Sequence, residues 1–272
     1  MEISFIILTW NSEQFIEQCL LSISKSCQKD EISNYEVIVI DNNSTDMTKE
    51  IIKNTTMGNA KRIELIELER NYGTTKTRNM GLQKSLGEYI CVLDSDAEIK
   101  NINYNYIFSY LDENPDVGIV APKLIYPNGD IQVSVKKFPT LSDKMKRLLK
   151  VFANRDLKHS DYYSDFPFNQ LREVETAISA FWIFRRETIS AVGLLDEKIF
   201  YSPEDVDYCL RVWKAGKKVV YCPFFEILHH TQQISHHKPF SKVSLSHFAG
   251  LLYYFWKHGY CFSRRKLPII GD

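Results

Sequence analysis

The chain has 272 residues, of which 44% are hydrophobic and 25% are charged, and its 34 Lys and Arg balance its 34 Asp and Glu. This composition is typical of a soluble globular protein, and the absence of net charge gives no reason to expect a nucleic-acid partner. No apolar run reaches the roughly 18 residues that a membrane-spanning helix needs, and the first residues lack the basic start of a signal peptide.

The first half of the chain alternates strands with helices. Near-continuous apolar runs predict strands that are covered on both faces, at residues 3–8, 35–41, 62–68 and 88–94. The segments between them predict helices, at 12–26, at 45–54 and after the loop that begins at Asn71. Strands separated by helices imply crossover connections and a mostly parallel sheet.

The second half mixes hairpin and helix signals. Residues 117–135 predict a strand, a Pro-Asn-Gly-Asp turn and a returning strand, whereas 140–170 have no clear period and predict a helix and a mobile loop. The other predicted elements are a strand at 174–186 with a short helix after it, a helix at 202–216, a strand at 217–223 and a helix at 241–259. Since there is no internal repeat and no low-complexity linker, we expect one α/β domain in two lobes.

Polar residues follow three of the predicted strands, namely Thr9–Ser12, Asp41–Asn43 and Asp94–Asp96. In open α/β sheets, ligands collect outside the carboxyl ends of the strands. Residues i and i+2 of an extended segment point the same way, so Asp94 and Asp96 can converge on one point. Carboxylates at this spacing suit Mg²⁺ or Mn²⁺, with open positions for water and substrate phosphate. A strand end followed by a turn cap has the same spacing, so the D-x-D pair alone does not decide.

An ordered set of segments extends this pattern over residues 3 to 230: IILTWNSEQFIEQCLLSI, VIVIDNNSTD, NYGTTKTRNMGL, GEYICVLDSDAEI and the stretch from ISAFWIFRR to KKVVYCP. Together they resemble the family 2 inverting glycosyltransferases of the GT-A fold. The resemblance implies a Rossmann-like, mostly parallel sheet flanked by helices, with a smaller acceptor-side lobe. We accordingly expect a glycosyltransferase domain at 1–240, with a nucleotide-sugar-binding half at 1–98 and an acceptor-side half at 99–240, and an aromatic and basic helix and tail at 241–272.

The resemblance implies that Asp94 and Asp96 hold a divalent metal on the diphosphate of a UDP- or dTDP-sugar. It assigns the other donor contacts to the strand ends and the glycine-bearing loop: Thr9, Asn11, Asp41, Asn43, Gly73, Arg78, Asp94 and Ser95. Asp41 suits this role because a carboxylate accepts from the imide N–H of uracil or thymine. On the residues alone, Asp41 is equally a turn residue before a helix, and Arg78 an exposed helix arginine.

The segment YSPEDVDYCLRVWKAG predicts a helix with Ser202 as its N-cap and Pro203 as its first helical residue. The helix dipole favours acidic residues in the first turn, which by itself explains Glu204 and Asp205. The resemblance makes Asp205 the general base, which takes the proton of the attacking acceptor hydroxyl, and Glu204 a supporting or acceptor-binding residue. The helix N-terminus is expected to keep Asp205 ionised.

Two further positions follow from the resemblance. Trp182 falls on the strand that flanks the acceptor in the family, although a buried core tryptophan is the commoner case. A histidine after the last strand completes the metal or diphosphate site in several relatives, and the sequence favours His229 over His230 as this third metal ligand without deciding between them. All these roles require the acidic sheet edge and the start of the 203–214 helix to face one cavity.

The last predicted helix, within SHFAGLLYYFWKHGYCFSRRK, is aromatic on one side and basic at its end. It suits packing on the domain, or peripheral contact with an anionic membrane near a lipid-linked acceptor. The six cysteines form no C-x-x-C pair and indicate reduced thiols, so we expect a cytoplasmic protein, free or at the inner face of the cell membrane. The sequence gives no indication of the oligomeric state.

These features predict a metal-dependent inverting glycosyltransferase that moves a hexosyl or deoxyhexosyl group to a glycan or lipid-linked acceptor in surface polysaccharide synthesis. The NYG loop and the aromatic tail resemble relatives that transfer rhamnose. A phosphatase of the haloacid dehalogenase type also uses D-x-D, but after its first strand. A non-catalytic sugar-binding or scaffold protein of the same fold is the other alternative, and it would tolerate Asp205→Asn.

Overall fold

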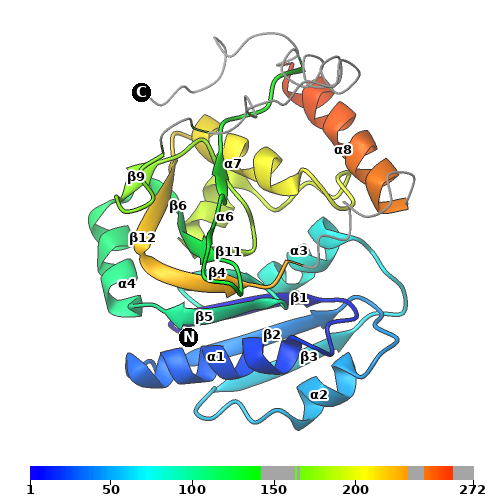
Figure 1. Cartoon of the computed structure of the whole chain (residues 1–272), viewed down its shortest axis with the longest axis vertical. Coiled ribbons are helices and arrows are strands. Elements are labelled where there is room, and N and C mark those ends of the chain that lie inside the picture. Colours follow the sequence, from blue (N-terminus) through cyan, green and yellow to red (C-terminus); the bar gives the residue numbers. More distant parts are fainter. Residues whose placement is uncertain (142–162, 164–165, 232–241, 260–272) are drawn as a thin grey trace.

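The N-terminal half of the chain forms a parallel sheet with helices on both faces. The computed structural model describes residues 1–141, 163, 166–231 and 242–259 (Figure 1). The first elements are β1 (Ile3–Thr9), α1 (Ile16–Lys29), β2 (Tyr35–Asp41), α2 (Thr48–Asn54), β3 (Arg62–Glu67), α3 (Thr74–Lys84) and β4 (Tyr89–Asp94). β1 lies between β2 and β4, and β3 pairs with the outer side of β2, all in parallel. The predicted strands and helices of this half are therefore confirmed to within a few residues.

The alternation of side chains along β1 decides which helix covers which face. Phe5 and Ile7 belong to the apolar cluster that includes the buried side of α1. Ile6, between them, belongs to a second cluster with Leu82 of α3. Successive strand residues point to opposite faces, so an apolar run such as ISFIIL requires cover on both sides of the sheet.

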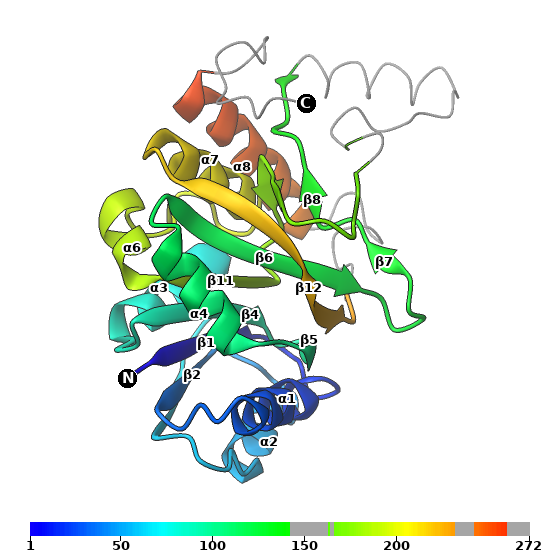
Figure 2. The same ribbon diagram turned by 90° about the vertical axis from the view of Figure 1, so that its left-hand side faces the viewer.

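The C-terminal half extends the same sheet with strands of both directions (Figure 2). Its elements are β5 (Ala97–Asn101), α4 (Tyr104–Glu113), β6 (Val117–Ile125), β7 (Ile131–Gln132), β8 (Val135–Lys136), β9 (Arg172–Glu173), β10 (Thr176–Ala177), β11 (Phe181–Arg185), α6 (Arg186–Val192), α7 (Glu204–Lys214), β12 (Lys218–His229) and α8 (Lys242–His258). The strand order is β3-β2-β1-β4-β11-β6-β12-β5, and a small separate sheet pairs β8 with β10. β11 runs antiparallel to β4 and β6, while β12 is parallel to β6.

Two boundaries and one additional helix differ from the sequence prediction. β12 continues to His229. Its register with β6 shifts between Cys222 and Glu226, and beyond the shift it pairs with β6 on one side and with β5, a strand that the apolar pattern does not indicate, on the other. α7 begins at Glu204; Pro203 occupies the N-cap position with a non-helical backbone, and no side chain caps the helix, so the predicted Ser202 cap is wrong. α4 was not predicted. Most of the helix and loop predicted at 140–170 lies outside the described residues.

The described cysteines are free and buried, as predicted for reduced core thiols: Cys19, Cys27, Cys91, Cys209 and Cys222. None of the described helices combines the length and the apolar character needed to cross a lipid bilayer. Both findings agree with the composition of the chain.

Two buried or half-buried aspartates attach α8 to the rest of the molecule. Lys257 Nζ donates to Asp207 and to Asp196, at 2.7 Å in each case. His258 Nε2 lies 2.8 Å from Asp207, and Tyr253 donates to Asp196 at 3.0 Å. Since Asp207 lies on α7, these contacts hold the last helix against the helix that starts at the sheet edge (Figure 1).

The Asp207 carboxyl makes this attachment sensitive to acid. Burial raises its pKa, but hydrogen bonds from His258 and Lys257 and the charge of Arg211 outweigh burial and lower the pKa to about 2. A carboxyl with a lowered folded-state pKa stabilises the fold above its ordinary pKa, and this contribution is lost as the pH falls from about 4 to about 2. We expect Asp207→Asn to reduce the free energy of unfolding at pH 7 by about 2 kcal/mol, measured by urea denaturation.

The matched control is Asp116→Asn, because Asp116 pairs with Lys218 at 2.8 Å on an exposed surface. Its expected cost is below about 1 kcal/mol. The difference in the free energy of unfolding between wild type and Asp207→Asn should become smaller below pH 4. A gap that stays constant down to the acid transition, or equal losses for the two variants, would contradict the assignment.

Candidate active site

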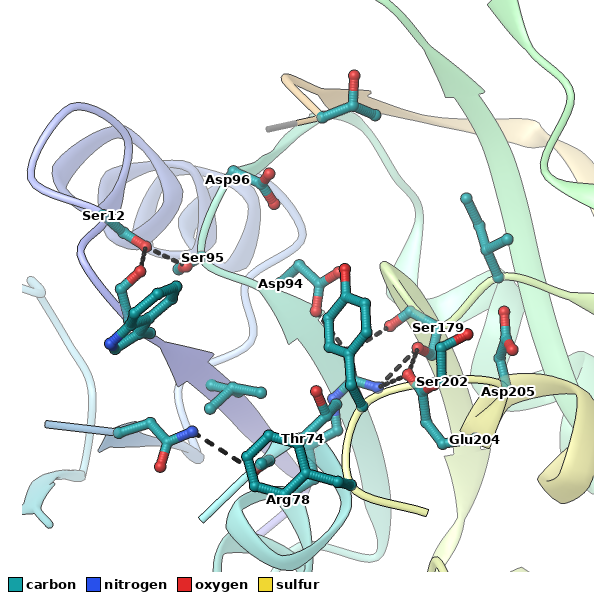
Figure 3. A pocket seen from close by; sticks show the side chains of 18 of the residues that line it. Ser12, Thr74, Arg78, Asp94, Ser95, Asp96, Ser179, Ser202, Glu204 and Asp205 are labelled. Atoms are coloured by element: carbon teal, nitrogen blue, oxygen red, sulfur yellow. Dashed lines mark hydrogen bonds and ion pairs between the residues drawn. The ribbon is translucent and has the colours of Figure 1, made fainter. Parts of the chain in front are cut away.

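A cavity of about 510 Å³ lies where the carboxyl ends of β1 and β4 meet the start of α7 (Figure 3). Its wall includes Trp10 and Ser12 after β1, Asp94, Ser95 and Asp96 at the end of β4, and Glu204 and Asp205 in the first turn of α7. The structure thus places the acidic edge of the sheet and the start of the helix on one cavity, as the sequence required.

One group of three metal-binding side chains (His, Cys, Asp or Glu) lies close enough together to hold a metal ion among the described residues. It consists of Asp94, Asp96 and His229. One ligand atom from each lies within 4.8 Å of the others. The long β12 brings His229 there, because its last residue pairs with Ala97, directly after the D-x-D turn. His230 points elsewhere: its Nε2 lies 2.7 Å from Glu98. The choice that the sequence left open falls on His229.

The side chains around His229 suit a divalent cation. His229 Nδ1 lies 2.9 Å from Gln132 Oε1, and Nε2 lies 3.4 Å from Asp96. With the proton on Nδ1, the lone pair of Nε2 can bind a cation that lies between the ring and Asp96; when Nε2 is protonated, it donates to Asp96 instead. A partner on the second ring nitrogen is the usual arrangement for a metal-binding histidine. Two carboxylates and one imidazole are a common ligand set for Mn²⁺ and an acceptable one for Mg²⁺.

The charges of this group are unbalanced without a cation. Burial raises the pKa of Asp94, the charge of Arg78 lowers it, and the neighbouring Asp96 raises it again, with a net rise. Burial lowers the pKa of His229, but the hydrogen bond and charge of Asp96 raise it above its ordinary value. Positive charge at this point would favour the ionised carboxylates, which the fold otherwise disfavours.

Arg78 joins the sheet edge to α7. Its guanidinium is buried and donates to Asp94 Oδ1 at 2.5 Å, to Glu204 Oε1 at 3.2 Å and to Ser179 Oγ at 2.6 Å (Figure 3). Ser179 donates in turn to Glu204 at 3.1 Å. Arg78 lines the cavity. Its side chain is only 2% exposed, so the alternative that the sequence left open, an exposed helix arginine, is wrong.

The two carboxylates at the start of α7 differ in their partners. Glu204 pairs with Arg78, yet burial and the neighbouring Asp205 raise its pKa to about 8. Asp205 accepts from the N–H of Val206 at 2.8 Å. That contact lowers the Asp205 pKa, as expected at a helix N-terminus, but burial outweighs it and the net shift is upward. The sequence-based expectation considered only the helix N-terminus, which favours the ionised form of Asp205, and did not include burial, which raises the pKa by more.

Four predicted donor contacts lie outside the cavity wall that the described residues form: Thr9, Asn11, Asp41 and Asn43. Asp41 Oδ2 accepts from the N–H of Ser44 at 2.9 Å, as a turn residue would. Asp41 Oδ1 and Thr9 Oγ1, side by side on β2 and β1, are buried without a hydrogen-bond partner in the described part of the chain. Asn11 instead accepts from the N–H of Thr45 at 2.9 Å.

The glycine-bearing loop closes another side of the cavity. Gly73 has φ +82°, and a Cβ there would lie 2.3 Å from the carbonyl oxygen of Phe200, so only glycine fits. The next residue, Thr74, donates its N–H to that same carbonyl at 2.6 Å. Asn42 accepts from the N–H of Tyr72 at 2.8 Å and donates to Asn71 at 2.9 Å.

Sequence reasoning missed the positioning roles of Asn42, Gln132 and Ser179. Asn42 does stand at a strand end, which is a signal for a site residue. Gln132 and Ser179 act through partners distant in sequence, and no local pattern marks them.

Trp182 is not part of the site. Its side chain is 1% exposed and stacks on Tyr208 with ring centroids 5.8 Å apart. The predicted acceptor contact is therefore corrected: β11 is an interior strand of the sheet, and the core takes its aromatic side chains. Trp10 lines the cavity instead and is 39% exposed.

Comparison with known proteins gives a consistent result. Residues 4–193 match the sequence model of glycosyl transferase family 2. An uncharacterized glycosyltransferase of Haemophilus influenzae is 32% identical over 193 residues, which cover 65% of this chain and 74% of that protein. The N-acetylglucosaminyl-diphospho-decaprenol L-rhamnosyltransferase of Mycobacterium tuberculosis is 24% identical over 254 residues, 89% of this chain and 80% of that enzyme.

Other relatives are much longer than the matched region. The poly(ribitol-phosphate) beta-N-acetylglucosaminyltransferase TarS of Staphylococcus aureus is 28% identical over 210 residues, 74% of this chain but 35% of that enzyme. An uncharacterized protein of Sinorhizobium fredii is matched over 21% of its length.

Solved structures show the same fold at low sequence identity. TarS residues 1–349 in complex with UDP superpose with a TM-score of 0.56 at 21% identity, over 84% of this chain and 60% of that one. GalNAc-T7 with UDP, GalNAc and Mn²⁺ superposes with a TM-score of 0.68 at 16% identity, over 94% of this chain and 49% of that one. These likenesses confirm the predicted GT-A architecture.

The Arg78 network leads to a stability prediction. Removing the guanidinium leaves the buried Glu204 and the partly buried Asp94 without their cation, and the loss of one partner of a buried ion pair typically costs about 3–5 kcal/mol. We expect Arg78→Gln to lower the free energy of unfolding by about 3 kcal/mol or more, measured by denaturation at pH 7. Lys218→Gln, which removes exposed ion pairs with Asp116 and Glu173, should cost below about 1 kcal/mol. Equal costs would show that Arg78 does not hold the two elements together.

Proposed function

Because this chain belongs to glycosyl transferase family 2, we propose that it is an inverting, metal-dependent glycosyltransferase that uses a UDP- or dTDP-sugar. Its acceptor is a hydroxyl of a glycan or of a lipid-linked glycan, in the synthesis of a surface polysaccharide. Family membership favours a glycosyltransferase over the phosphatase, and the Asp205→Asn test below separates the enzyme from a non-catalytic protein of the same fold.

One observation carries the proposal: the Asp94, Asp96 and His229 group and the Asp205 carboxylate line the same cavity. Sugar transfer needs a place for the diphosphate and a base for the acceptor within one site. A volume of about 510 Å³ is in the range of small-molecule pockets.

Asp205 has the properties of the general base. Its carboxylate lines the cavity, and its Oδ1 contact with the N–H of Val206 fixes the orientation of the side chain. A base works best when its pKa is close to the working pH, and burial shifts Asp205 in that direction. In the proposed reaction, an acceptor hydroxyl loses its proton to Asp205 while its oxygen attacks the anomeric carbon, and the C–O bond to the diphosphate breaks on the opposite face. This displacement inverts the configuration.

Asp94, Asp96 and His229 would hold Mg²⁺ or Mn²⁺, with Ser95 and Arg78 beside the diphosphate. A bound divalent cation neutralises the negative charge that develops on the leaving diphosphate. The charge of Arg78 lowers the pKa of Asp94, and its hydrogen bond holds the carboxylate in place. Glu204, which Arg78 and Ser179 hold, supports the Asp205 side of the cavity.

The donor nucleotide rests on chemistry and on relatives. Asp41 Oδ1 is unpartnered in the described part of the chain and is an acceptor of the right kind for the imide N–H that uracil and thymine share. Because Asp41 and Thr9 are fully buried outside the cavity wall, this contact requires the loops of Asn11 and Asn43 to move when the nucleoside binds. A neighbouring structure contains UDP, and one relative is named a dTDP-rhamnosyl transferase. Rhamnose is therefore a candidate sugar, and the name of the mycobacterial relative supports a lipid-linked acceptor. We also propose a cytoplasmic location. The proposed division of the chain is a nucleotide-sugar-binding half at 1–98, an acceptor-side half at 99–240 and a C-terminal helix and tail at 241–272.

The first test is Asp205→Asn. We expect the rate of sugar transfer to fall at least about 10²-fold while donor binding stays within about threefold of wild type, because the amide cannot take the proton. Transfer is followed by product chromatography over a panel of UDP- and dTDP-sugars, and donor binding by calorimetry. The exposed Glu88→Gln serves as the control and should retain full activity. Undiminished transfer by Asp205→Asn would refute its role as the base.

The second test concerns the metal. We expect EDTA to abolish transfer and Mn²⁺ or Mg²⁺ to restore it. Asp96→Asn should weaken Mn²⁺ binding at least about tenfold, and Gln132→Leu about 10–100-fold, because it frees the His229 ring. Glu98→Gln, which touches His230 and not the group, should bind Mn²⁺ like wild type. Full activity in EDTA would exclude metal dependence.

A further inference from the structure

α8 turns a row of large apolar side chains away from the protein. Leu245, Phe248, Leu252 and Trp256 are 59%, 61%, 50% and 75% exposed. Their spacing of three and four residues places them on one face of the helix. Single exposed apolar residues are common, but a continuous row on one helix usually marks a contact surface. We call these four residues the outer row.

The opposite face of α8 packs against the protein. Tyr254 and Phe255 are buried in the core cluster that includes α7, and Lys257 and His258 bind Asp207. These contacts fix the rotation of the helix, so the outer row cannot turn inward without breaking them. Figures 1 and 2 show α8 beside α7 at the outside of the molecule.

α8 also lies directly on the candidate site. His247, in its first half, is part of the cavity wall. Gly250 packs so closely that a Cβ there would lie 2.2 Å from the carbonyl oxygen of Ser202, two residues before Glu204. The outer row therefore runs beside the cavity, and a surface that contacts this row comes close to the substrates.

The charge of this part of the chain favours one kind of partner. Residues 243–256 contain no Asp, Glu, Lys or Arg. Across 231–271 there are six Lys and Arg and no acidic residue, although the whole chain has no net charge. Three of these cations, Arg264, Arg265 and Lys266, follow soon after α8 ends. An apolar helix face next to cationic residues is the pattern of a helix that lies in the interface of an anionic membrane.

We propose that the outer row of α8 docks this protein on an anionic lipid surface, with the cavity held at the level of the lipid head groups. A second copy of the chain is a poorer occupant, because four side chains fall well short of a typical stable protein interface. Docking on lipid does not depend on the reaction that the protein catalyses. The further idea that docking brings the cavity close to a lipid-linked acceptor rests on the proposed function.

The test is co-sedimentation of the full chain with vesicles of phosphatidylcholine containing phosphatidylglycerol, and with vesicles of phosphatidylcholine alone. Wild type should bind the anionic vesicles, less so at high salt. F248S/W256S should lower the partition coefficient at least about tenfold, because it removes the two largest apolar side chains of the row. L86S/F224S removes exposed apolar side chains, 61% and 54% exposed, from other elements and should bind like wild type.

Three further readouts complete the test. R264S/R265S/K266S should reduce the preference for anionic over neutral vesicles. The oligomeric state of wild type and of F248S/W256S, measured by analytical ultracentrifugation, should be the same. Equal sedimentation of wild type and F248S/W256S, or a wild-type dimer that F248S/W256S dissociates, would overturn the proposal. Donor hydrolysis in the absence of vesicles should be unchanged in F248S/W256S, so loss of membrane binding and failure of the proposed function are distinguishable.

Discussion

The buried guanidinium of Arg78 is the contact on which the cavity depends. It holds Asp94 at the end of β4 and Glu204 at the start of α7, two carboxylates that are 110 positions apart in the sequence and would otherwise be costly to bury. Both have raised pKa values in spite of this cation. The site is therefore built with an excess of negative charge, and a divalent cation at Asp94, Asp96 and His229 fits that excess.

The rest of the structure fixes the parts around Arg78. The register shift in β12, beyond which this strand lies between β6 and β5, carries His229 to the D-x-D turn, where Gln132 orients its ring. Gly73 lets the loop before α3 touch the segment that leads into α7. α8 closes on the same segment through Gly250. The approaches of His229 to the D-x-D turn and of Gly73 to Phe200 join the two halves of the chain, and the approach of Gly250 to Ser202 joins distant elements of the C-terminal half, so the cavity depends on both halves.

The N-terminal half of the fold was predictable because its strands are apolar runs covered on both faces, separated by helices. The D-x-D pair and the acidic first turn of α7 were found for the same reason: both stand at element ends. The sequence could not show the burial of Trp182, because a core strand and an acceptor-side strand have the same apolar pattern. It also could not show β5 or the full length of β12, whose pairing depends on a register shift. The Arg78 network joins distant positions, which no local pattern reveals.

The most direct test is a crystal structure of the chain grown with Mn²⁺ and a nucleoside diphosphate, with anomalous difference density collected for the metal. The account predicts one strong anomalous peak between Asp94, Asp96 and His229, with the diphosphate next to it and Asp205 across the same cavity. A nucleotide bound with its diphosphate away from these residues, or an anomalous peak at a different place on the protein, would contradict the account.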